Sequence, residues 1–371
     1  MDPRTFVLSL AAAPASSLVP DLDALSDRER DVLRRVVQRF IDTAAPVGSK
    51  ALSDDIELSS ASVRTTMSRL EQAGYLDHPH TSAGRIPTVQ GYRTYVDDLM
   101  DVGGLSAREA KLLREGVRRR LGDIDAIAEE SSRLMGRLAQ LLGVVLTPSI
   151  ATGVLDRIEI VPLSSTRVLF VLALRGGLAR TVQAEVDAPL VPSHLDAVVR
   201  RLNERLSGLT LGEVRRTGAE RVQDLAPEDQ TGIVRIVLRD APSLFEEPRL
   251  TRRAAIAGAS HLVGQPEFAQ PEVIRDIVEL AENADVVVHL LERPARVDPA
   301  DPGRAVVLIG REVDPEATEE RPQVSVVTAP YHVGDAAGAV AVIGPTRMDY
   351  PRAVALVEYV ARLLDRPTGG R

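Results

Sequence analysis

Residues 59–88, SSASVRTTMSRLEQAGYLDHPHTSAGRIPT, decide the fold of the N-terminal part of this chain. The first half predicts an amphipathic helix, because Val63, Met67 and Leu70 follow one another at i, i+4 and i+7. Gly74 ends this pattern, as glycine commonly does after a helix. The opposite face carries small and hydrogen-bonding side chains, namely Ala61, Ser62, Thr65, Ser68, Arg69 and Gln72.

A two-stranded hairpin is predicted directly after this helix. Residues 75–77 and 85–88 have short strand patterns, and a polar loop lies between them. A polar helix face alone is more often a solvated surface. Together with the hairpin it indicates a winged helix-turn-helix, in which the third helix enters the major groove and the hairpin contacts the flanking DNA.

Two upstream helices complete the predicted winged-helix domain, which covers residues 26–103. Ser26-Asp27-Arg28-Glu29 matches a capping box, and apolar residues then recur at helical spacing to about Thr43. Ser49 is expected to begin a short second helix, and Thr88 is expected to cap a further helix after the hairpin. Residues 1–25 contain only a short apolar stretch and are predicted to be a disordered tail.

The rest of the chain is predicted to be an α+β body. Residues 104–150 have a helical pattern that begins at a second capping box, Ser106-Ala107-Arg108-Glu109, and they are interpreted as a connector. Residues 151–190 and 280–367 contain short apolar runs and are expected to share one sheet, with a mainly helical insert at 191–279. The strands predicted late in the chain lie at 286–291, 305–309, 324–328 and 338–343, and one strand inside the insert lies at 233–238.

The composition excludes several classes of protein. The chain has no Cys, which excludes disulfides and thiolate metal sites, and it has no apolar run of the roughly 18 residues that a membrane span needs. We therefore expect a cytoplasmic protein. A net charge of −8 argues against nonspecific coating of nucleic acid. Positive charge prevails within residues 59–95, whose charged side chains are Arg64, Arg69, Arg85 and Arg93 against Glu71 and Asp77.

No enzymatic motif is recognised in the chain. The six His do not form a His-Glu-x-x-His pattern, and neither a Gly-x-Ser-x-Gly elbow nor a phosphate-binding loop is present. His78 and His80 lack further ligands nearby, so contacts with DNA backbone or solvent are favoured over a metal site. We expect no catalysis, no cofactor and no bound metal.

With these features in place, the chain resembles the heat-inducible transcription repressor family HrcA over almost everything after the tail. Family members usually have Asn and an acidic residue after the third-helix Arg, where this chain has Thr65-Thr66. The motifs that carry the resemblance are Ala45-Pro46-Val47-Gly48-Ser49, Ser59-Ser60-Ala61-Ser62-Val63-Arg64, Leu70-Glu71-Gln72-Ala73-Gly74-Tyr75-Leu76, Pro79-His80-Thr81-Ser82-Ala83-Gly84-Arg85-Ile86-Pro87, Gly91-Tyr92-Arg93-Thr94-Tyr95-Val96-Asp97 and Ile343-Gly344-Pro345-Thr346-Arg347-Met348-Asp349-Tyr350.

The resemblance implies a fold and a function. The fold is a winged helix followed by a GAF-like domain into which a dimerising segment is inserted. The function is repression of chaperone operons through an inverted-repeat operator of the CIRCE type, with a GroEL-type chaperonin keeping the repressor active. Two-fold symmetric DNA requires a homodimer. The alternative is a winged-helix regulator that senses a small molecule, because GAF-like domains often hold ligands.

Nine residues are predicted to contact operator DNA. Ser62, Thr65 and Arg69 are expected to read base edges, and Ser60 and Arg64 to help position the helix. The hairpin residues are expected to clamp the flanking backbone. The full set is Ser49, Ser60, Ser62, Arg64, Thr65, Arg69, His80, Ser82 and Arg85.

Overall fold

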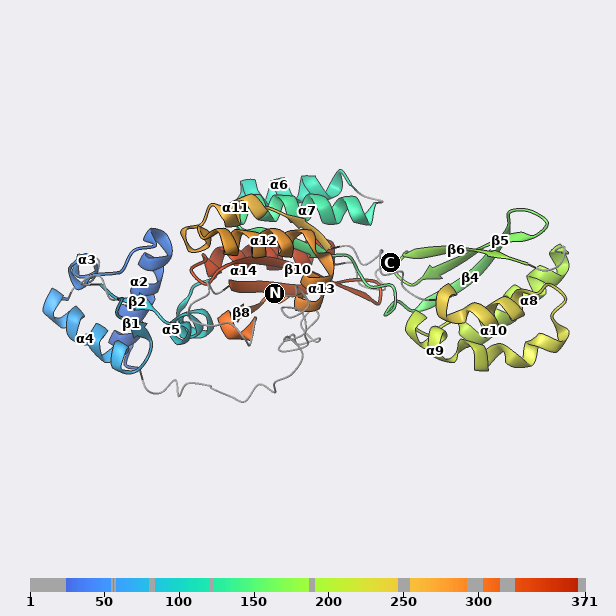
Figure 1. Cartoon of the computed structure of the whole chain (residues 1–371), viewed down its shortest axis with the longest axis horizontal. Coiled ribbons are helices and arrows are strands. Elements are labelled where there is room, and N and C mark those ends of the chain that lie inside the picture. Colours follow the sequence, from blue (N-terminus) through green and yellow to red (C-terminus); the bar gives the residue numbers. More distant parts are fainter. Residues whose placement is uncertain are drawn as a thin grey trace.

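The computed structural model has a mixed α/β fold and an elongated shape (Figure 1). An N-terminal module lies at one end, a sheet domain lies in the middle, and an inserted body lies at the other end. The predicted tail lies outside the described residues, apart from Leu25. The structure describes residues 25–54, 56, 58–79, 84–120, 123–186, 191–245, 254–291, 303–313 and 324–365.

The N-terminal module combines short helices with a small antiparallel sheet. The capping box predicted at Ser26 is present, and α2, α4 and both hairpin strands lie where the sequence predicted them. Val47 joins the small sheet, because it exchanges two backbone hydrogen bonds of 2.8 and 2.9 Å with Arg85. The elements are α2 (Asp27–Thr43), α3 (Ser49–Ser53), α4 (Ser60–Gln72), β1 (Leu76–Asp77) and β2 (Ile86–Pro87).

The next helices along the chain connect this module to the sheet domain, and further helices cover the sheet. The predicted helix after Thr88 forms as α5 (Val89–Thr94), which packs on α2 and β2 and is the last helix of the module, and it continues as a π-helical turn, Tyr95–Leu99. A second predicted capping box, at Ser106, begins α6. The helices of the sheet domain are α6 (Ala107–Arg118), α7 (Ile124–Ala139), α11 (Ala259–Val263), α12 (Pro271–Glu282), α13 (Ala284–Leu291) and α14 (Tyr350–Leu364).

The sheet domain is built, within the described residues, on five antiparallel strands in the order β7-β3-β10-β9-β8. α14 packs on β9 and β10, and α7 packs on β3 and β7. β3 is buried at every position, so both faces of the sheet are covered there. The strands are β3 (Leu142–Leu146), β7 (Ala254–Ala257), β8 (Val306–Ile309), β9 (Val324–Val333) and β10 (Ala336–Pro345).

The inserted body lies in the chain between β3 and β7, which are neighbours in the sheet. The predicted insert at 191–279 is therefore wrong at both ends, because the body already includes the strands at 155–185 and ends before β7 at 254. Its described strands form a separate antiparallel sheet in the order β4-β5-β6, and its helices bury one face of that sheet in a core of its own. The elements are β4 (Leu155–Pro162), β5 (Arg167–Leu174), β6 (Ala179–Glu185), α8 (Pro192–Leu206), α9 (Leu211–Val222) and α10 (Ile233–Leu244).

The prediction that strands of 151–190 share a sheet with strands of 280–367 is therefore wrong. β4, β5 and β6 pair only with each other among the described residues, and their buried face packs against the helices that follow. Each strand has the same alternation of apolar and polar residues whichever sheet it joins. The pattern predicted the strands correctly, but it contains no information about their partners.

The connector prediction for 104–150 is wrong at its C-terminal end. Residues Leu142–Leu146 form β3, which pairs with β10 on one side and β7 on the other. A short apolar run that is buried on both faces cannot be told from the end of a buried helix by periodicity alone. The connector helices themselves, α6 and α7, are present.

Two segments predicted as strands are helices. Residues 233–238 lie in α10 and residues 286–291 lie in α13. Their β-branched residues favoured strands, but packing outweighs this weak preference. In α10 the buried Asp229 also stabilises the first turn, since its Oδ2 accepts a hydrogen bond from Val234 N at 2.9 Å. The predicted strands at 324–328 and 338–343 are confirmed as parts of β9 and β10, and the strand predicted at 305–309 is confirmed as β8 from Val306 onward.

Candidate nucleic-acid interface

Helix α4 is held by its inner face and by its N-terminal end. Val63, Met67 and Leu70 are buried against the rest of the module, as their spacing predicted. Ser59 caps the helix, because its Oγ accepts a hydrogen bond from Ser62 N at 3.2 Å. α4 lies at the end of the molecule opposite the inserted body (Figure 1).

The N-terminal end of α4 is attached to α3 through two hydroxyl groups. Ser49 Oγ and Ser60 Oγ lie 3.2 Å apart and share a hydrogen bond. Ser49 is only 9% exposed, whereas Ser60 is half-buried. These two predicted site residues are thus brought together inside the contact between the helices, and they orient α4 relative to α3.

The exposed face of α4 contains Arg64, Thr65 and Arg69, while Ser62 is half-buried. Thr65 Oγ1 donates a hydrogen bond to the carbonyl oxygen of Ala61 at 3.1 Å, so its proton is used within the helix and its oxygen can still accept a hydrogen bond. Thr66 is only 5% exposed and lies on the inner face. Of the two positions at which this chain departs from the usual family pattern, only Thr65 therefore lies on the exposed surface.

Arg85 lies at the base of the hairpin and contacts the end of α4. Its Nε donates a hydrogen bond to Glu71 Oε2 at 2.9 Å, and its Nη2 lies 2.8 Å from the same oxygen. The Arg85 side chain is 18% exposed, so most of its surface is used within the module. This ion pair fixes the start of β2 against α4 and was not predicted, because its partners are 14 residues apart in different elements.

The same end of the hairpin passes close to the turn between α2 and α3. A Cβ atom built on Gly84 would lie 2.7 Å from the backbone carbon of Pro46, which is closer than real Cβ atoms approach. Glycine is needed at this position because two backbone segments meet there. The predicted site residues His80 and Ser82 lie outside the described residues.

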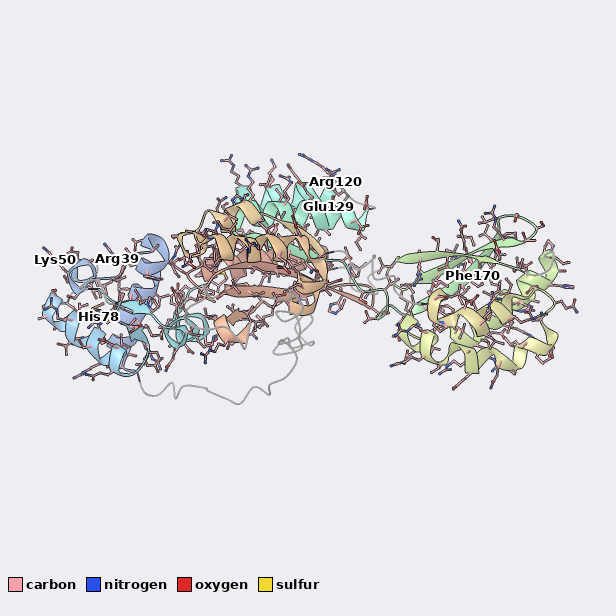
Figure 2. All side chains as sticks on the ribbon, viewed as in Figure 1. Arg39, Lys50, His78, Arg120, Glu129 and Phe170 are labelled. Carbon is pink, nitrogen blue, oxygen red and sulfur yellow. The ribbon has the colours of Figure 1, made fainter. Side chains whose placement is uncertain are left out.

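Charges around α4 are mixed rather than uniformly positive. Hydrogen bonds from Ser26 lower the pKa of Glu29 below its ordinary value, and the positive charge of Arg69 acts in the same direction. Arg69 therefore lies near the first turn of α2 as well as on the exposed face. Lys50 on α3 is exposed at the outer end of the module (Figure 2) and was not among the predicted residues. Its position one residue after Ser49 was the available signal.

Neither metal nor membrane chemistry is indicated by the part of the chain that is described. No group of three or more His, Asp or Glu side chains in it could hold a metal ion. Among the same residues, no helix has the length and apolar character of a membrane span. The exposed face of α4, with the supporting contacts from α3 and the hairpin, is therefore the best-defined candidate site in the N-terminal module.

Comparison with known proteins identifies the family. The family model for the HrcA protein C-terminal domain matches residues 125–354. The heat-inducible transcription repressor HrcA of Chlorobium phaeobacteroides (strain BS1) is 39% identical over 344 residues, which cover 91% of this chain and 96% of that protein. The protein of the same name from Prosthecochloris aestuarii is 37% identical, with 91% and 96% covered.

A crystal structure of a hypothetical protein, determined at 2.2 Å resolution, has a similar fold. Its TM-score is 0.56 at 24% sequence identity, and the match covers 91% of this chain and 97% of that chain. The similarity therefore extends over nearly the whole length of both molecules. By sequence, the chain belongs to the HrcA family of heat-inducible transcription repressors, as its motifs predicted.

Proposed function

We propose that this repressor binds an inverted-repeat operator of the CIRCE type as a homodimer and thereby represses chaperone operons. Repressors are not a class of enzyme, and the chain acts by occupying DNA. In this proposal the N-terminal module is a winged helix-turn-helix that inserts α4 into the major groove. A GroEL-type chaperonin modulates the activity of the dimer.

The observation that carries the proposal is the exposed face of α4 with Arg64, Thr65 and Arg69. Small and hydrogen-bonding side chains allow a helix to approach base edges, and Arg can form two hydrogen bonds with guanine in the major groove. We assign base contacts to Arg69, Thr65 and Ser62. Arg64 is assigned a phosphate contact, which positions the helix without reading sequence.

Two further predicted residues act through α4 in this proposal. Ser49 is almost fully buried and pairs with Ser60, so it orients the recognition helix relative to α3. Arg85 holds the start of β2 against α4 through Glu71, so it positions this strand of the hairpin. We propose that His80 and Ser82 contact the flanking DNA backbone.

We assign dimerisation to the inserted body and a GAF-like role to the sheet domain. The described part of the inserted body exposes large apolar side chains at Val161, Leu163 and Val191, each between 44% and 47% exposed. Where such side chains form a contiguous patch on a monomer, they often mark an interface between subunits. In a dimer that joins through this body, the α4 helix of each subunit lies at the end of that subunit far from the dimer interface (Figure 1).

The ligand-sensing alternative has weaker support. A hollow of about 250 Å³ lies in the inserted body, and charged side chains including Arg200, Arg201 and Glu228 line it. Small-molecule sites are usually mainly apolar with a few polar groups. A thermal shift assay against a panel of metabolites would detect a ligand, because binding raises the stability of the folded state by mass action.

Fluorescence anisotropy tests the proposed function directly. The purified protein is titrated onto an inverted-repeat duplex of the family's type and onto a scrambled duplex at matched, near-physiological salt. We expect a clear preference for the repeat, and purified GroEL-type chaperonin should then increase its occupancy. Equal and salt-sensitive binding to both duplexes would contradict the proposed operator.

A further inference from the structure

The N-terminal module is attached to the sheet domain through Arg347, which follows β10. Its Nη1 donates a hydrogen bond to the carbonyl oxygen of Ile41 in α2 at 2.7 Å. Its Nη2 donates to Gln265 Oε1 at 3.0 Å, and its Nε forms a short ion pair with Glu267. One guanidinium group thus joins three segments that are far apart in the sequence.

The contact with Ile41 satisfies the C-terminal end of α2. The last four carbonyl groups of a helix have no partner within the helix, and a positive charge near them is favourable. The last turn of α2, all of whose residues are described, contains no basic side chain. Arg347 supplies this charge from the sheet domain, 306 positions later in the chain.

A second arginine makes the reverse contact. Arg93, on α5 of the module, donates from Nη2 to the carbonyl oxygen of Val307 in β8 at 3.1 Å, and its Nη1 lies 3.6 Å from Glu312. The rings of Tyr92 and Tyr350 lie beside these contacts, with centroids 6.0 Å apart. Each side of the interface therefore contributes an arginine to a backbone carbonyl of the other side.

The burial of both arginine side chains favours one orientation of the module relative to the sheet domain. The side chains of Arg347 and Arg93 are 13% and 15% exposed. A guanidinium group is planar with donors in fixed directions, so two or more simultaneous hydrogen bonds define its orientation. Leaving a buried ionic group without its partner is strongly unfavourable. A module rotated away from this position would break several buried contacts at once.

We infer that Arg347 is a positioning residue that sets the orientation of α4 relative to the rest of the subunit, and hence the half-site spacing the dimer accepts. This inference rests on the proposed function, because spacing has meaning only for a dimer on a two-part operator. Half-site spacing follows from the distance and angle between the two recognition helices. If the module were free to rotate, more spacings would be tolerated and each would be bound less tightly.

The first test measures the orientation itself and needs no DNA. Because the chain contains no Cys, Lys50→Cys and Glu129→Cys give two specific sites for spin labels, one on the module and one on α7. Both side chains are exposed (Figure 2). Labelled chain is mixed with an excess of unlabelled chain, so that any oligomer contains one labelled pair. Pulsed electron spin resonance then gives the distribution of distances between the labels.

Arg347→Gln is expected to broaden or shift this distribution. Arg352→Gln is the matched control, because Arg352 also bonds a carboxylate and a carbonyl group, Glu109 and Leu138, but does so entirely within the sheet domain. The control should keep the narrow distribution of the parent. If Arg347→Gln does not fold by circular dichroism, Glu267→Gln replaces it, since it removes the charged partner and retains Arg347. An unchanged distribution in a folded variant would overturn the inference.

The second test measures spacing on DNA. Anisotropy titrations use duplexes whose half-sites are separated by the natural spacing or by one or two base pairs more or fewer, together with a single half-site. Arg347→Gln should lose roughly tenfold in affinity at the best spacing, retain its half-site affinity and discriminate less among spacings. Unaltered discrimination in this variant would count against the role of Arg347. Failure of the parent to prefer any repeat would instead refute the proposed function, while the distance measurement would still decide the orientation.

Discussion

The N-terminal module and the inserted body are both joined to the sheet domain, but in different ways. Buried apolar residues form one continuous cluster that runs through the module and the sheet domain, from Val32 in α2 to Leu364 in α14. The inserted body has a separate cluster of buried apolar residues, which includes Phe170. Figure 2 shows Phe170 at the end of the molecule opposite Lys50.

This difference separates the mechanical roles of the two regions. A shared core and buried arginine contacts make the module and the sheet domain one packed unit, so a change in the sheet domain can alter the position of α4. A body with its own core can unfold or associate without disturbing that unit. The first prediction tests this difference in stability directly, and the other three test features of the shared unit: the hairpin contact, the DNA-binding face of α4 and the start of α6.

The largest effect is expected from Phe170→Ala. Phe170 is 1% exposed within the core of the inserted body, and truncation of a buried Phe lowers the free energy of unfolding by about 3–5 kcal/mol. In calorimetry we expect the transition of the inserted body to move to lower temperature while the transition of the shared core stays in place. Met135→Ala, in the fully buried part of α7, should produce the opposite pattern. Equal movement of both transitions in either variant would mean that the two cores unfold as one unit.

A smaller effect, within the shared unit, is expected from Gly84→Ala. The added methyl group would overlap the backbone of Pro46, and overpacking of this kind typically lowers the free energy of unfolding by about 1–3 kcal/mol. The matched control is Gly104→Ala, because a Cβ atom there meets no atom within 4 Å. Urea denaturation followed by circular dichroism measures both variants. A Gly84→Ala protein as stable as the control would show that the hairpin can shift away from Pro46.

Arg69→Ala should weaken DNA binding without affecting stability. We expect a loss of about 1–3 kcal/mol in binding free energy on the inverted repeat and a smaller loss on scrambled DNA, because a contact to a base is specific for sequence. Arg64→Ala should weaken binding to both duplexes alike, as expected for a phosphate contact. Both side chains are exposed, so the melting temperatures should remain close to that of the parent. Equal losses on the two duplexes for Arg69→Ala would refute its base contact.

The smallest effect concerns the pH dependence of stability at the start of α6. Hydrogen bonds from Ser106, together with Arg352, lower the pKa of Glu109 below its ordinary value of 4.5. Because the pKa is lower in the folded state, this stabilisation is present above pH 4.5 and is lost as the pH falls through the folded value.

Glu109→Gln tests this dependence, since Gln can also complete a capping box but does not titrate. The variant should lose less stability than the parent on acidification, by less than about 1 kcal/mol, in urea denaturation at a series of pH values. Arg362→Gln provides a control, because Arg362 pairs with Glu358 within α14 at the surface. Parallel pH profiles for the parent and Glu109→Gln would show that Glu109 contributes nothing to acid sensitivity.

Local signals in the sequence predicted the module well. The capping boxes at Ser26 and Ser106 depend on residues three positions apart, and the inner face of α4 depends on i, i+4 and i+7 spacing. Such short-range patterns act in the same way in any fold. The exposed positions of Thr65 and Arg69 followed directly from this spacing, whereas Arg64, which is also exposed, was not on the predicted outer face. The family motifs added the identity that spacing alone does not contain.

The sequence by itself thus determined the family, the helices and strands of the module, and the outer face of α4. Tertiary structure decided which strands share a sheet, that residues 142–146 form a central strand, and that Arg85 pairs with Glu71. It also decided that Arg347 caps α2 from the far end of the chain. The physical reason is range: caps and helix faces are fixed by neighbours within one or two turns, whereas sheet partners and interdomain ion pairs form only when distant segments pack together.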